Sequence, residues 1–139
     1  MRNLPILLLI FLGACSADIQ PALVASNVTI TQPMPGMTMS AGYLTLTNNS
    51  EETITITRVS SPSYASVELH ETVVEDGVAR MRSLERLDIP AGASTVLAPG
   101  GKHLMLMRPR VAVDSISLQF YDGATLLLTV TSSEPQESR

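Results

Sequence analysis

Residues 67–82, Val67-Glu-Leu-His-Glu-Thr-Val-Val-Glu-Asp-Gly-Val-Ala-Arg-Met-Arg82, decide the fold class. Two runs rich in β-branched residues flank an Asp-Gly pair, which is typical of a two-residue hairpin turn because both positions tolerate a positive φ. Placing that turn at Asp76-Gly77 sets the register, in which Thr72 faces Met81. The stretch therefore predicts an antiparallel β-hairpin.

Short runs of the same kind recur along the chain and are separated by turn residues. The further expected strands are 24–31, 42–47, 53–59, 95–97, 103–107, 115–121 and 125–131. Sustained helical periodicity is not found in any stretch of 11–18 residues. Roughly eight or nine short strands in a domain of this size predict an all-β, Greek-key sandwich or barrel.

The composition of the 139 residues excludes several classes of function. With 9 Lys+Arg against 13 Asp+Glu there is no basic stripe for a nucleic-acid backbone. Trp is absent and aromatic residues are 4%, too few for a base-stacking platform. The single Cys excludes an internal disulfide, a zinc ribbon and a redox dithiol.

The N-terminus has the features of an export signal. Arg2 precedes an apolar run from Leu4 to Ala14, which is too short to span a membrane. The run ends in Leu12-Gly-Ala-Cys15, which resembles a bacterial lipobox, and this resemblance implies cleavage before Cys15 and lipidation of its thiol. A plain secretory peptide is the alternative. Because Ser16 is not an aspartate retention signal, we expect anchoring at the periplasmic side of the outer membrane rather than the inner one.

The expected organisation is a signal peptide over 1–14, a lipidated N-terminus and tether over 15–22, one β-sandwich domain over 23–131, and a flexible tail over 132–139.

Both histidines lie in expected strands with a methionine nearby. Side chains alternate along a strand, so His70 shares a face with Thr72 and is a diagonal neighbour of Met81 in the predicted hairpin. The same parity places His103 and Met105 on one face of their strand. The two pairs could meet at one end of the sandwich, although the spacing alone does not bring them together.

Two imidazoles and two thioethers form a soft, neutral ligand set. Thioethers are poor ligands for Zn²⁺, Mg²⁺ and Ca²⁺ but suit Cu(I). A blue-copper site needs a thiolate, and the expected domain contains no cysteine.

Two other interpretations remain open at this point. One is a zinc-dependent hydrolase in which a histidine acts as general base; Glu68 could be a third ligand, whereas Glu71 would point to the face opposite His70. The other is a structural or interaction module that binds no metal.

A proline-containing loop, Gln32-Pro-Met-Pro-Gly-Met-Thr-Met-Ser40, carries three of the seven methionines. Met34, Met37 and Met39 could fill gaps over a barrel end or form a soft-donor arm near a metal. We favour the first interpretation, because thioethers at this spacing are a weak signal.

The pattern His70-x10-Met81-x21-His103-x-Met105 is identical in spacing to the motif of the PCuAC family of periplasmic copper chaperones. The surroundings are also similar to that family, including 42–48, 67–72, 89–92 and 99–107. The resemblance covers about 22–131 and implies a cupredoxin-like β-sandwich. It also implies a copper chaperone rather than an enzyme, with His70, Met81, His103 and Met105 as the Cu(I) ligands. The implied partners are the copper-site subunit of cytochrome c oxidase and a Sco-type thioredoxin-like protein.

Overall fold

The computed structural model describes residues 20–33, 35–110 and 115–133. The expected signal peptide, Cys15 and most of the tail lie outside these residues. Within the described ranges the regular secondary structure consists of strands, and no helix there is long and apolar enough to cross a membrane. The strands are β1 (Leu23–Ile30), β2 (Met39–Asn48), β3 (Ile54–Ile56), β4 (Arg58–Ser60), β5 (Tyr64–Glu75), β6 (Val78–Ser83), β7 (Leu87–Ile89), β8 (Ser94–Leu97), β9 (Lys102–Pro109), β10 (Ser115–Asp122) and β11 (Thr125–Ser133).

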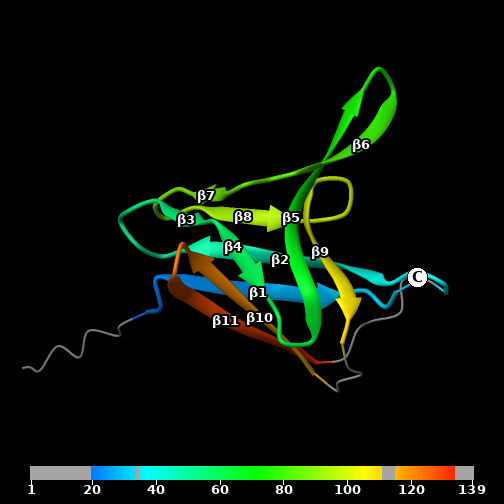
Figure 1. The fold of residues 1–139 in the computed structure, drawn as a ribbon. Helices are drawn as coiled ribbons and strands as arrows, with labels where there is room; N and C mark the ends of the chain where they lie inside the picture. Colours follow the sequence, from blue (N-terminus) through cyan, green and yellow to red (C-terminus); the bar gives the residue numbers. More distant parts are fainter. Residues whose placement is uncertain (1–19, 34, 111–114, 134–139) are drawn as a thin grey trace, which may run out of the picture.

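The main sheet runs in the order β1-β2-β9-β5-β4-β10-β11, with antiparallel pairing between all neighbours. It curls until β11 lies beside β1, so the sheet is a nearly closed barrel (Figure 1). β6 pairs with β5, β8 pairs with the second half of β2, and β3 and β7 form a separate two-stranded sheet. This confirms the expected all-β, Greek-key, cupredoxin-like β-sandwich.

The core lies inside the curled sheet and follows the alternation of the strands. Along β2 and β10, buried and part-exposed residues alternate, as the period of two requires. Leu104 and Leu106 of β9 are fully buried, so Met105 between them faces outward, as do His103 and Met107 by the same alternation. The parity of β9 therefore separates core leucines from the candidate ligands.

Close packing of β2 on β9 depends on Gly42, whose partner across the ladder is Leu104. A Cβ at Gly42 would lie 3.1 Å from Leu106 Cδ1 and 3.2 Å from Leu104 Cβ. Because both neighbours are buried, there is little room for a side chain here. β9 is thus packed tightly against β2 on its core-facing side.

The hairpin of β5 and β6 has the predicted register. Thr72 pairs with Met81, and the turn residues Asp76 and Gly77 have φ of 52° and 77°. Two consecutive positive φ values are the signature of the hairpin turn that Asp-Gly favours. The local sequence signal was sufficient here.

The structure corrects the prediction of a single strand over 53–59. The chain divides at Thr57, whose N–H donates to the Tyr121 carbonyl at 2.9 Å and whose Oγ1 accepts from the Gly123 N–H at 2.7 Å. These bonds move the chain from the β3–β7 pair to the main sheet. β7 was missed because three residues followed directly by Pro90 give too short a pattern.

Candidate metal centre

The two histidines face each other across the ladder between β5 and β9. His70 pairs with His103, and their ring centroids lie 6.1 Å apart with an interplanar angle of 88°. Cross-strand partners share one face of a sheet, here the outer face. The sequence predicted a face for each histidine, and the fold brings the two rings together.

His103 is held in place by the turn that precedes it. The residue is 6% exposed, and its Nδ1–H donates to the Gly101 carbonyl at 2.9 Å. The same carbonyl accepts the Thr72 N–H at 3.1 Å, which ties the turn to β5. A proton fixed on Nδ1 leaves the lone pair on Nε2, the arrangement that a metal-ligating imidazole uses. The sequence analysis assigned no role to this carbonyl. The turn residues at 99–101 were the one sequence feature that could have indicated it.

His70 has one partnered and one unpartnered ring nitrogen. Its Nε2–H donates to Glu68 Oε2 at 3.2 Å, which leaves the lone pair on Nδ1. In the part of the chain that the structure describes, Nδ1 is buried without a hydrogen-bond partner. Burying such a nitrogen is costly. A metal ion beside the two rings would satisfy it.

The two methionines of the predicted ligand set lie in very different settings. Met105 follows His103 on the outer face of β9 and pairs with Glu68 on one side and Ala41 on the other. Met81 lies on β6, diagonal to His70, and is 61% exposed. Figure 1 shows the β5–β6 hairpin projecting from the body. All four residues therefore share one face, with three on the body and one on a projecting ribbon.

The acidic residues nearby do not complete an oxygen-rich metal site. Glu71 lies on the other face, where its carboxylate pairs with Lys102 at 3.0 Å. Glu68 contacts His70, but no group of three or more His, Cys, Asp or Glu among the described residues could hold a metal ion. This arrangement does not favour the zinc-hydrolase interpretation, which needs a carboxylate beside both imidazoles.

The model of one protein family, described as "Putative lipoprotein LpqE-like", matches residues 23–131. The chain belongs to the LpqE-like family. Among curated relatives, "Putative lipoprotein Lxx21020" of Leifsonia xyli is 34% identical over 96 residues, covering 65% of this chain and 58% of the relative. "Uncharacterized protein RP573" of Rickettsia prowazekii is 30% identical over 86 residues, covering 59% and 48%. The matched part thus spans about half the length of these relatives.

Solved structures that include a PCuAC domain share the fold of this LpqE-like chain. The solution structure of CuI-DR1885 from Deinococcus radiodurans has a TM-score of 0.63 and 27% identity, covering 86% of this chain and 81% of that one. The copper-bound PCuAC domain from PmoF2 has a TM-score of 0.64 and 16% identity, covering 85% and 94%. The resemblance to the PCuAC family is confirmed.

Proposed function

We propose that this protein is an extracytoplasmic copper chaperone that binds one Cu(I) through His70, Met81, His103 and Met105. The observation that best supports this proposal is the His70–His103 pair. The lone pair of His103 lies on Nε2, and His70 has a buried Nδ1 without a hydrogen-bond partner among the described residues. Support comes from the 27% identity to the protein of the CuI-DR1885 solution structure. The proposed role is binding and delivery, not catalysis.

The donor set suits delivery. Imidazole and thioether ligands are neutral, and the thioether is a soft donor that prefers Cu(I) to Zn²⁺ or Mg²⁺. An acceptor that offers thiolates binds Cu(I) more strongly, so transfer runs downhill. Met81, on its exposed hairpin, is the ligand most accessible to an acceptor.

Comparison of Met105→Leu with Met107→Leu tests the assignment. Both methionines lie on the outer face of β9 and both are partly buried, but Met107 pairs with Met39 and Ser66, one step further from the histidines. We expect Met105→Leu to weaken Cu(I) binding about tenfold or more and Met107→Leu to leave it nearly intact. Cu(I) affinity is measured by chelator competition under reducing conditions, with thermal unfolding of each apo protein as the folding check. The reverse ranking would reject the four-residue site.

We further propose that Cys15 carries the lipid that anchors the protein on the periplasmic side of the outer membrane. The support is the Leu12-Gly-Ala-Cys15 sequence and the lipoprotein name of the family. Two or more acyl chains hold a protein stably at a membrane, since each buried CH₂ contributes about 0.8 kcal/mol. Cell fractionation of the wild type and of Cys15→Ser tests this: the variant should be released from the membrane or remain unprocessed. Wild-type protein found free in the periplasm would overturn the proposal.

The proposed acceptor is the copper-site subunit of cytochrome c oxidase, with a Sco-type thioredoxin-like protein acting alongside. This rests on the PCuAC resemblance. When the Cu(I)-loaded protein is mixed with the purified apo domain of that subunit, the copper should move from this chain to the subunit. Copper that stays on this chain in the presence of excess acceptor would exclude that partner.

A further inference from the structure

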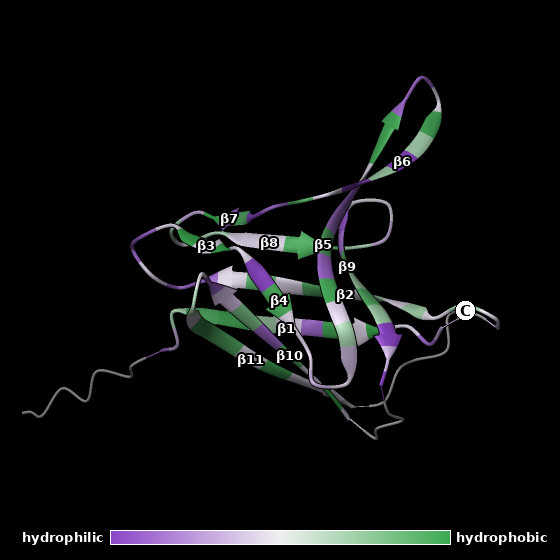
Figure 2. Cartoon of the chain, viewed as in Figure 1, coloured by the Kyte–Doolittle hydropathy of each residue, from purple (hydrophilic) through white to green (hydrophobic). Residues whose placement is uncertain are grey.

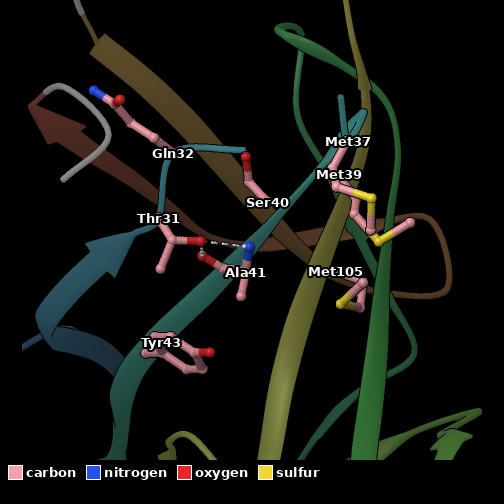
Figure 3. Close-up of a pocket in the computed structure, with 8 residues that line it drawn as sticks. All are labelled: Thr31, Gln32, Met37, Met39, Ser40, Ala41, Tyr43 and Met105. Atoms are coloured by element: carbon pink, nitrogen blue, oxygen red, sulfur yellow. Dashed lines mark hydrogen bonds between the residues drawn. The ribbon is translucent and has the colours of Figure 1, made fainter. Parts of the chain in front are cut away.

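A hollow of about 300 Å³ lies beside the candidate ligands, between the segment leading into β2 and the outer face of β9. Three thioether side chains, those of Met37, Met39 and Met105, line it and are grouped on one side (Figure 3). The other described residues lining it are Thr31, Gln32, Ser40, Ala41 and Tyr43. We propose that the three methionines form a second subsite for a soft monovalent cation, Cu(I) or Ag(I).

The first argument is exposure. Met37 and Met39 are 46% and 37% exposed, so much of each side chain is available to a ligand rather than packed against the protein. A single exposed methionine is unremarkable, but here two exposed thioethers and a partly buried one line a single hollow. The exposure of these side chains therefore favours the soft-donor interpretation of this loop.

The second argument is donor chemistry. Among the described residues that line the hollow, none is His, Cys, Asp or Glu. Hard cations such as Mg²⁺ and Ca²⁺ require several oxygen ligands, usually carboxylates, and Zn²⁺ favours nitrogen and thiolate. Thioethers select Cu(I), and Ag(I) is its redox-inert analogue of the same charge and softness.

The third argument is that the backbone holds the hollow open. Ala41 stands opposite Met105 and between Met39 and Tyr43 on the same face of β2, so a small side chain leaves the space above it free. The Met37–Met39 segment is fixed to β9 by the Arg108 N–H, which donates to the Thr38 carbonyl at 2.7 Å. The three sulfur atoms are therefore carried by elements hydrogen-bonded to one another.

The position of Met105 links the subsite to the histidine pair. Met105 follows His103 by two residues on the same face, about 7 Å along the strand at about 3.3 Å per residue. An ion can pass between the sets with Met105 bound throughout: the bonds to the Met37 and Met39 sulfurs break as bonds to the His70 and His103 nitrogens form. The charge of the ion stays +1, so no oxidant or reductant is needed. This hand-over role rests on the proposed function, whereas binding of the ion at the three thioethers does not.

Ag⁺ titration of the protein labelled with ¹³C at the methionine methyl groups tests the proposal. The methyl signals of Met81 and Met105 should shift with the first equivalent. With the second, those of Met37 and Met39 should shift and that of Met105 should shift again, because its sulfur is shared between the two sets. In Met37→Leu/Met39→Leu the second binding event should disappear, while affinity for the first Ag⁺ stays within about threefold. Met107→Leu, the matched control on β9, should keep both events.

A His70→Ala/His103→Ala variant separates this inference from the proposed function. The tight first event should be lost, while Ag⁺ still shifts the methyl signals of Met37, Met39 and Met105. Unchanged Met37 and Met39 signals at excess Ag⁺ in the wild type would overturn the second subsite and leave the proposed function standing. Signals from Met37 and Met39 that respond while the Met81 signal does not, at any ratio of Ag⁺ to protein, would overturn the proposed function instead.

Discussion

β9 and β6 each carry part of the candidate site, and they differ in how the fold supports them. β9 is paired on both sides, backed by the tightly packed Gly42, and holds His103 at 6% exposure. β6 pairs only with β5, all of its residues are exposed, and Met81 is 61% exposed. The histidine half is therefore preorganised by the core, while the Met81 half remains accessible on a ribbon. Such a division suits a site that must hold an ion and also release it.

The hairpin also carries exposed apolar side chains near its tip. Val74 and Val78, which flank its turn, are 71% and 53% exposed, and Figure 2 shows apolar colour near the tip. A two-stranded ribbon without a covered face contributes little stability of its own. Opening of the hairpin is thus expected to cost far less than opening of the β5–β9 ladder.

The largest expected effect is at the preorganised half. His103→Ala should lower Cu(I) affinity by more than about 100-fold, since loss of even an outer partner of a metal ligand costs about 10–100-fold. Chelator competition measures the affinity, and thermal unfolding of the apo protein shows how much of the loss comes from the cavity left by a buried ring. An affinity within tenfold of the wild type would remove His103 from the ligand set.

The next effect tests how the core supports β9. Gly42→Ala should reduce the free energy of unfolding by about 1–3 kcal/mol, because the new methyl group overpacks against Leu104 and Leu106. Amide exchange should accelerate along β9. Gly77→Ala is the matched control: nothing lies within 4 Å of its Cβ, and the strain from φ of +77° should accelerate exchange only in the hairpin. If Gly42→Ala and Gly77→Ala accelerated amide exchange in β9 equally, the proposed difference between β9 and the hairpin would be wrong.

A smaller effect is expected at the accessible half. Met81→Leu should weaken Cu(I) binding about tenfold, which corresponds to about 1.4 kcal/mol. The apo protein should unfold within about 0.5 kcal/mol of the wild type, because the side chain is mostly exposed. Val78→Leu on the same hairpin is the control and should leave copper affinity unchanged. Substantial loss of apo stability in Met81→Leu would show that the hairpin is packed in solution.

The smallest effect is expected at Glu68, the acceptor of the His70 Nε2–H. Glu68→Gln keeps an acceptor oxygen for the His70 Nε2–H, and the carboxylate it replaces is 46% exposed, so its net contribution is about 0–1 kcal/mol. Copper affinity should therefore fall by no more than about fivefold, as measured by the same competition assay. A loss as large as that of His103→Ala would make the carboxylate a ligand and revive the zinc-type interpretation.

The parts of this site that could be predicted from sequence are local. The Asp76-Gly77 turn fixed the hairpin register, and strand parity placed His103 and Met105 on one face because alternation does not depend on the rest of the fold. The pairing of His70 with His103 joins strands distant in sequence, and no local signal reports it. The burial of the candidate ligand His103 and the exposure of the candidate ligand Met81 likewise depend on which strands pack over them.

The methionine loop also shows that local sequence does not determine which side chains become buried. Its sequence contains the soft donors, but whether Met37 and Met39 pack inward depends on where β9 lies relative to the start of β2. The division of 53–59 at Thr57 is similar, since the bonds that break the strand come from Tyr121 and Gly123. In each case a distant partner decides between two locally acceptable arrangements.

X-ray absorption at the copper edge, recorded on the protein with one equivalent of Cu(I), tests the central claim most directly. The account predicts two nitrogen and two sulfur scatterers from His70, His103, Met81 and Met105, and one sulfur fewer in Met81→Leu. A spectrum with only nitrogen and oxygen neighbours, or with sulfur alone at one equivalent, would contradict it.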